Sequence, residues 1–139
     1  MIGIVLVGHA GIASEMRKAL EHVVGEQPLI ETLDVLNDNA PEDLSAILEL
    51  RIRACDVGKG VLLLADMFGG TPCNVAMGAL EMGRVEVVSG FNLPLLIKAA
   101  TLRKSIKDLP ELAAQVVESG RHYMRVVPHI TRPGGKGRG

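Results

Sequence analysis

Short apolar runs alternate with segments of helical periodicity along most of this chain. Residues 2–7, 29–36, 61–65 and 85–88 form the apolar runs and are predicted to be strands. Residues 2–7 and 61–65 are almost continuously apolar, as in central strands that helices cover on both faces. Residues 29–36 include polar side chains, which suits a more exposed strand. The alternation predicts an α/β fold with a mostly parallel sheet and helices on both faces.

Five helices are expected between and after the strands. The first helix is expected to end at Gly25, and the second is expected to begin with Asn39 as its N-cap. The third begins with Thr71 as a capping residue and Pro72 at the first helical position. The predicted helices span residues 12–24, 71–83, 92–104 and 110–120, with a further helix from residue 39 onward. The apolar face of that further helix holds residues 44, 47 and 48.

The last part of the chain differs from this pattern. Residues 121–127 follow the fifth helix and resemble a short strand. Residues 128–139 are rich in glycine and basic side chains, and we expect them to be disordered. The chain is therefore predicted to hold one folded domain, residues 1–127.

Composition excludes several classes of protein. Apolar residues make up 47% of the 139 residues and charged residues 22%, which indicates a globular domain. Aromatic residues make up only 2%, too few for the stacking platforms that bind single-stranded nucleic acid. The net charge of −1 is not typical of a protein that binds the phosphate backbone of a nucleic acid, which requires a basic surface. Nucleic-acid binding is not expected.

The chain also has no pattern that predicts secretion or membrane insertion. The first apolar run is too short for a signal peptide, and none reaches the length of roughly 18 residues that a membrane helix requires. Cys55 and Cys73 fit no paired motif, so both are expected to be reduced thiols. These features predict a cytoplasmic protein.

A histidine and an aspartate end two of the predicted strands. His9 follows the first strand and Asp66 the third. The carboxyl ends of parallel strands meet at one edge of a sheet, so both side chains are expected there. A neutral imidazole is a good nucleophile near pH 7, and a carboxylate would fix its tautomer. Alone, His9 could be an ordinary loop histidine and Asp66 a helix or turn cap.

The residues around this pair favour phosphoryl transfer. Gly8 and Gly11 flank His9 and would let other groups approach closely. Gly69, Gly70 and Thr71 follow Asp66 at a predicted helix start, where backbone N–H groups bind anions.

Other reaction classes lack their residues in this sequence. There is no phosphate-binding loop of the nucleotide-binding type, and a lone aspartate makes a poor magnesium site. We therefore expect no metal, no cofactor and no ATP-dependent kinase activity. Cys73 could be a nucleophile but fits a small buried residue better. The three other histidines, His22, His122 and His129, are interpreted as surface residues.

Met67 and Phe68 lie between Asp66 and the glycine pair. Their side chains could contact a partner protein at the rim of the site or be buried in the core. Both interpretations remain open from the sequence.

Several segments resemble the mannose-family enzyme IIA of the bacterial phosphoenolpyruvate-dependent sugar phosphotransferase system. The resemblance extends over nearly the whole chain to about Val127. The matching segments are residues 4–11 (IVLVGHAG), 24–27 (VGEQ), 64–74 (LADMFGGTPCN), 90–94 (GFNLP) and 118–121 (ESGR).

This resemblance implies a function, a mechanism and a fold. It places the phosphorylated histidine at His9 and its partner at Asp66. The phosphocarrier protein HPr would be the donor, a separate IIB component would be the acceptor, and the membrane would be reached only through the transporter. It also implies a sheet of strand order 2-1-3-4 and a homodimer that exchanges a carboxyl-terminal strand.

Two alternative functions remain. The chain could be a regulatory protein whose phosphorylation state controls a partner, without a dedicated transporter. It could also be the related phosphoryl-donor subunit of dihydroxyacetone kinase, although such subunits are often fused to further carrier domains. The sequence does not identify a sugar.

Overall fold

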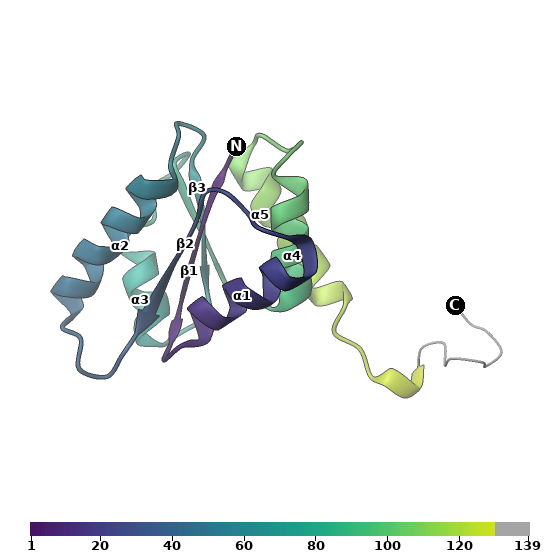
Figure 1. The fold of residues 1–139 in the computed structure, drawn as a ribbon, viewed down its shortest axis with the longest axis horizontal. Coiled ribbons are helices and arrows are strands. Elements are labelled where there is room, and N and C mark those ends of the chain that lie inside the picture. Colours follow the sequence, from purple (N-terminus) through teal and green to yellow (C-terminus); the bar gives the residue numbers. More distant parts are fainter. Residues whose placement is uncertain (130–139) are drawn as a thin grey trace.

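Four parallel strands form the central sheet in a computed structural model of the chain, which describes residues 1–129 (Figure 1). They are β1 (Gly3–His9), β2 (Ile30–Val35), β3 (Val61–Ala65) and β4 (Val85–Ser89). Their order is β2-β1-β3-β4, as predicted. The nearly continuous apolar strands β1 and β3 occupy the middle, and β2 lies at an edge.

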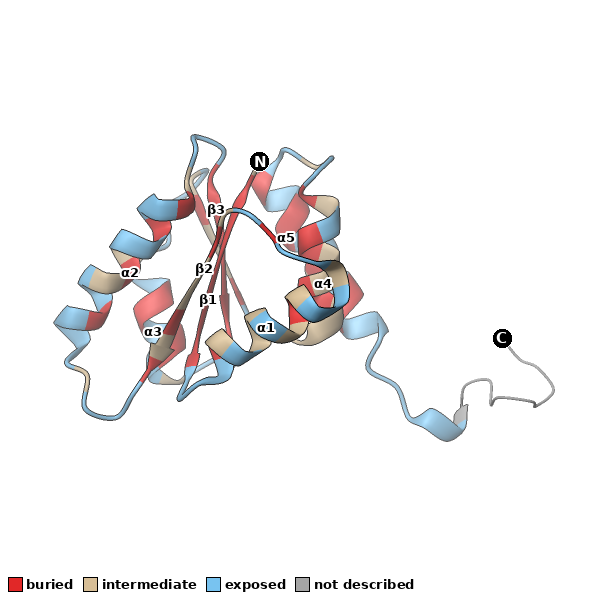
Figure 2. Cartoon of the chain, in the orientation of Figure 1, coloured by how far each residue is buried: buried red, intermediate tan, exposed pale blue. Residues whose placement is uncertain are grey.

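Helices cover both faces of the sheet, which confirms the predicted layers (Figure 1). One core joins the sheet to α1 (Ile12–Val24), α4 (Leu93–Leu102) and α5 (Leu109–His122). The other joins it to α2 (Pro41–Cys55) and α3 (Thr71–Met77). Figure 2 shows that the buried residues lie along the strands and on the helix sides that face them. Among residues 1–129, no helix is long and apolar enough to span a membrane.

Three predicted helix boundaries were wrong. α3 ends at Met77 rather than Gly83, because Gly78 ends the helix and the following turn leads into a bridge between Glu81 and Val85. Thr71 is the first helical residue, and Gly70 occupies the N-cap position. Asn39 does not cap α2, because its Oδ1 atom accepts a hydrogen bond from the backbone N–H of Leu36 at 2.9 Å and closes the preceding turn.

The strand predicted at residues 121–127 does not form in the single chain. α5 continues to His122, and the chain then leaves the body of the molecule and ends its described part in a 3-10 turn at Val127–His129 (Figure 1). A strand requires a hydrogen-bonding neighbour, and among the described residues no strand pairs with residues 121–127. Strand exchange in a dimer stays a prediction. Pro128 and His129 belong to the turn, and the rest of the predicted disordered tail lies outside the described residues.

A buried arginine fastens the end of α4 to the amino edge of the sheet. The Arg103 side chain is fully buried, and its guanidinium donates to the carbonyl oxygens of Ile2 at 3.1 Å, Pro28 at 2.6 Å and Leu29 at 3.2 Å. It also donates to Oε1 of Gln27 at 3.3 Å. Burial lowers the pKa of Arg103 below its usual value. These oxygens accept from both terminal nitrogens of the guanidinium, whereas its buried Nε has no hydrogen-bond partner among the described residues.

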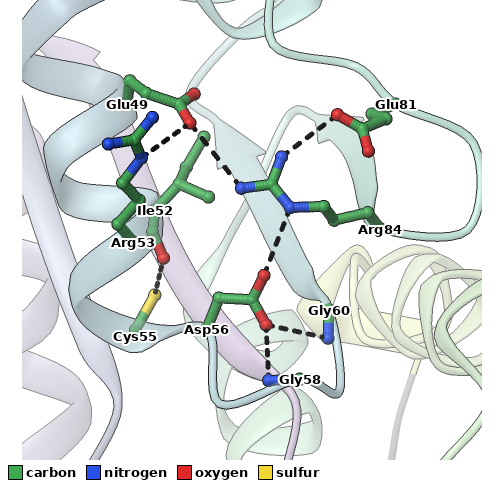
Figure 3. A network of polar contacts seen from close by, with 9 residues as sticks. All are labelled: Glu49, Ile52, Arg53, Cys55, Asp56, Gly58, Gly60, Glu81 and Arg84. Atoms are coloured by element: carbon green, nitrogen blue, oxygen red, sulfur yellow. Dashed lines mark hydrogen bonds and ion pairs between the residues drawn. The ribbon is translucent and has the colours of Figure 1, made fainter.

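A second polar network lies at the surface of the same edge (Figure 3). The Arg84 guanidinium, just before β4, lies 3.1 Å from a carboxylate oxygen of Glu81, 3.3 Å from one of Asp56 and 3.6 Å from one of Glu49. Asp56 also accepts hydrogen bonds from the backbone N–H of Gly58 at 2.9 Å and Gly60 at 3.3 Å. The network connects the end of α2 to the starts of β3 and β4.

Candidate active site

His9 and Asp66 lie side by side at the opposite, carboxyl edge of the sheet. His9 is the last residue of β1, and Asp66 directly follows β3, the strand that pairs with β1. The parallel register places Val7 beside Ala65, so the chain brings together two residues 57 positions apart. The juxtaposition expected from the sequence is present.

A single carboxylate oxygen holds both the backbone and the ring of His9. Oδ2 of Asp66 lies 2.8 Å from Nδ1 of the ring and accepts the backbone N–H of His9 at 2.9 Å. Oδ1 accepts the backbone N–H of Met67 at 2.9 Å. The Asp66 side chain is 9% exposed and that of His9 48%. The carboxylate is therefore fixed, while the imidazole reaches solvent.

These contacts determine which ring nitrogen of His9 is free. Burial by itself would raise the pKa of Asp66, but the hydrogen bonds from the His9 backbone and ring and from Met67 outweigh it and lower the pKa. An ionised carboxylate only accepts hydrogen bonds, so Nδ1 carries the proton in this contact. Nε2 then keeps its lone pair and is the ring nitrogen without a contact to Asp66.

Gly70 lies directly against this free nitrogen. A Cβ atom added to Gly70 would be 2.9 Å from Nε2 and 2.7 Å from Cε1 of His9. Gly69, the residue before it, has a φ of +93°, in the region that favours glycine. Neither glycine has a side chain, so the backbone of this turn is uncovered beside the His9 ring.

The two glycines that flank His9 have different roles. A Cβ at Gly8 would meet Cγ2 of Ile12 at 2.3 Å and Oδ2 of Asp66 at 3.4 Å, so close approach requires glycine there. A Cβ at Gly11 would meet nothing within 4 Å. No described group of the chain approaches Gly11 closely, and approach by another molecule there stays a prediction.

Thr71 and the two apolar loop residues are at or near the molecular surface. Thr71 begins α3 and lines a hollow between α2 and α3 together with Ser45 and Asn74. The Met67 side chain is 54% exposed and that of Phe68 is 72% exposed. Burial of Phe68 in the core is thus excluded. A role for these residues in docking stays a prediction.

The remaining candidates lie away from this chemistry. Cys73 is 1% exposed and belongs to the interior, as expected for a small buried residue. Burial raises the pKa of the Cys55 thiol to about 11. His22 and His122 are exposed, as predicted. In the described part of the chain, no three His, Cys, Asp or Glu side chains come close enough to hold a metal ion.

Sequence reasoning did not identify a second carboxylate near this edge. Asp34, close to the end of β2, accepts the backbone N–H of Ser14 at 3.0 Å and the Ser14 hydroxyl at 2.6 Å. The available signal was its position, because an acidic residue near the carboxyl end of a strand lies at the same edge as His9 and Asp66.

Comparison with known proteins agrees with the fold and shows the family of the chain. The family model described as the PTS system fructose IIA component matches residues 3–117. The mannose-specific EIIAB component of Escherichia coli K12 is 31% identical over 127 residues, which cover 91% of this chain. The chain spans only 39% of that relative's length.

Two further proteins match more of their own length. The sorbose-specific EIIA component of Lacticaseibacillus casei is 33% identical over 100 residues, 70% of each chain. A solved structure of the mannose/sorbose-specific IIA subunit from Enterococcus faecalis is 30% identical, with a TM-score of 0.80, and the match covers 95% of this chain and 96% of that one. The chain therefore belongs to the IIA family of the sugar phosphotransferase system (PTS) that the mannose, sorbose and fructose components represent.

Proposed function

We propose that this chain carries a phosphoryl group on Nε2 of His9, which it accepts from phospho-HPr and passes to a IIB component. The observation that supports this most directly is the contact between Nδ1 and Asp66, which leaves Nε2 as the free nitrogen beside Gly70. Membership of the IIA family supports a role in sugar phosphotransfer.

In the first transfer, the Nε2 lone pair attacks the phosphorus of the donor's phosphohistidine. A new N–P bond forms on His9 while the donor's N–P bond breaks, and the donor nitrogen keeps the electron pair. Positive charge develops on the His9 ring during this step. The Nδ1 proton stays with the ring, and the adjacent carboxylate of Asp66 stabilises that charge. Transfer to the acceptor repeats the same exchange with His9 as the donor.

The turn after Asp66 would hold the phosphoryl oxygens. Gly69, Gly70 and Thr71 lie where the backbone enters α3, and a Cβ atom added to Gly70 would collide with the His9 ring. Backbone N–H groups at such a turn can donate to an anion without bringing in a fixed positive charge. Binding of this kind stabilises the group while allowing it to leave again.

The exposed apolar residues beside the pair suit contact with partner proteins. Met67 and Phe68 extend from the loop after β3, and Ile12 and Leu36, 40% and 53% exposed, begin α1 and follow β2. All four residues belong to segments at the carboxyl edge of the sheet, which also holds His9. We propose that they form the surface on which HPr and the acceptor dock.

Mass spectrometry of the intact protein tests this function. Incubation with phosphoenolpyruvate, enzyme I and HPr should add one phosphoryl group, which His9→Ala should abolish without unfolding the protein. His22→Ala, which alters an exposed histidine on α1, is the matched control and should label normally. Phosphate on any other histidine would refute the assignment. Labelled protein that transfers to none of the candidate IIB proteins would favour the regulatory alternative.

A further inference from the structure

The structure links Asp34, on the edge strand β2, to the first turn of α1. Both carboxylate oxygens are engaged by Ser14, since Oδ1 accepts the backbone N–H at 3.0 Å and Oδ2 accepts the hydroxyl at 2.6 Å. The Ser14 hydroxyl also lies 3.2 Å from the carbonyl oxygen of Gly11. A hydroxyl has one proton, so the shorter contact with Asp34 is the stronger hydrogen bond.

This contact replaces a cap that α1 lacks in its own sequence. Gly11 is the N-cap residue and has no side chain to accept the first N–H groups of the helix. Asp34 performs this function from a neighbouring strand, where its backbone lies beside Gly8 of β1. The start of α1 is therefore fastened to the sheet at the position where β1 ends.

The turn from β1 into α1 begins at His9, the last residue of the strand, and ends at Gly11, the N-cap of the helix. Two hydrogen bonds hold the backbone of this turn. The N–H of His9 donates to Oδ2 of Asp66 at 2.9 Å, and the N–H of Ala10 donates to the carbonyl oxygen of Val35 at 3.0 Å. Ala10 has a φ of +51°, which is unfavourable for a residue other than glycine. A strained turn keeps its shape only when its ends are fixed, and Asp34 fixes the helical end through Ser14.

The same carboxylate affects where a phosphoryl group can be bound. The start of α1 is only three residues from His9 and would otherwise attract an anion through its free N–H groups. Asp34 already occupies this position and adds a negative charge there. The more favourable side for a phosphoryl group is then that of Gly70, where an added Cβ atom would be 2.9 Å from Nε2 of His9.

From these contacts we infer that Asp34 is a positioning residue for phosphoryl transfer, which acts through Ser14 to hold the His9 turn in place. The inference rests on the proposed function of His9. It concerns a residue that touches neither the His9 ring nor Asp66 in the described contacts.

The test compares Asp34→Ala and Asp34→Asn with a helix-cap variant far from the site. Asparagine can still accept the Ser14 N–H with its oxygen, and its amide can donate to the Ser14 hydroxyl. The matched control is Asp108→Ala, because Oδ2 of Asp108 caps α5 in the same way by accepting the Glu111 N–H at 3.0 Å. Leu109, the first residue of that helix, lies at the amino edge, away from His9, where a Cβ atom added to Gly60 would be 3.1 Å from its Cδ2 atom.

Three measurements are needed for each variant. They are the melting temperature, the rate of transfer from phospho-HPr in rapid-quench experiments, and the population of the His9 tautomer protonated on Nδ1, from ¹⁵N NMR of the unphosphorylated protein. Both alanine variants should melt a few degrees lower. Only Asp34→Ala should slow transfer, by about tenfold or more, and reduce the Nδ1–H population, because small misplacements of a reacting group have large effects on rate.

The outcomes distinguish a role of Asp34 in positioning the His9 turn from an effect on protein stability and from an effect of its negative charge. Recovery of transfer in Asp34→Asn to within about threefold of wild type would support the inference. Normal transfer in Asp34→Ala, or equal slowing in Asp108→Ala, would overturn it. So would an Asp34→Asn variant as slow as Asp34→Ala, because charge would then be the cause. If the wild-type protein takes no phosphoryl group on His9, the proposed function fails, and the NMR measurement still tests whether Asp34 holds the turn.

Discussion

Gly70→Ala should block phosphoryl transfer while leaving the protein folded. The backbone at Gly70 is extended, with φ −93° and ψ 173°, so alanine fits it without strain. The new methyl group would lie 2.7 Å from Cε1 of His9. An ordinary contact begins near 3.4 Å, so the ring must move by about 0.7 Å. The ring is held through Nδ1 at 2.8 Å from Asp66, and this movement would weaken that bond.

The two effects of this substitution differ greatly in size. Misplacement of a reacting group by about 1 Å can reduce a rate about 100-fold, which corresponds to about 2.7 kcal/mol. The methyl would also partly cover Nε2, the attacking atom. The free energy of unfolding should change by less than about 1 kcal/mol, because alanine restricts the unfolded chain and the exposed imidazole can move aside.

Single-turnover transfer from phospho-HPr and urea unfolding measure the two effects separately. Gly11→Ala is the control, because it adds the same methyl two residues after His9, where nothing lies within 4 Å. Its transfer rate should remain close to that of wild type. A normal rate in Gly70→Ala, or an equal loss in both variants, would refute the steric reasoning.

Four further predictions follow from contacts described above. Asp66→Asn should slow transfer. Because the pKa of Asp66 in the folded protein lies below its unfolded value of about 3.9, the wild-type protein should be more stable than this variant above that pH, and the difference should disappear as the pH falls through the lower folded pKa. Urea unfolding of both proteins at several pH values measures this difference. Arg103→Met should lower the free energy of unfolding by about 3 kcal/mol, because it leaves buried carbonyls unpaired, whereas Arg84→Met, at the surface, should lower it by much less. Phe68→Ala should raise the KM for phospho-HPr more than it lowers the melting temperature, and a large loss of stability with normal kinetics would contradict docking. If residues after Gly120 complete a homodimer, their deletion should give a monomer or an unstable protein in analytical ultracentrifugation, and a full-length chain that is monomeric at micromolar concentration would contradict this expectation.

The parts of the fold that hydrophobic pattern controls were predictable from the sequence. β1 and β3 are continuous apolar runs, and their burial on both faces follows from that pattern. His9 and Asp66 could be expected to meet because parallel strands end at one edge. The strand order came from the family resemblance, because periodicity gives no information on which strands are neighbours.

Features that depend on three-dimensional contacts were harder to predict. Asn39 has the chemistry of a helix cap but bonds to Leu36 instead, and this choice depends on the path of the turn. Asp34 is an ordinary polar residue of a strand until Ser14 is placed beside it. Residues 121–127 have the composition of a strand, but without a neighbouring strand they cannot form one in a single chain.

The Arg84 network lies at the end of the sheet opposite His9, just before β3 and β4 begin (Figure 3). Its separation from the reacting edge offers a practical attachment point. A fluorophore, surface tether or fused domain placed near Glu81, in the exposed turn before Arg84, would leave the His9 edge free for partner proteins. A chain immobilised in this way could report phosphoryl arrival and departure one molecule at a time.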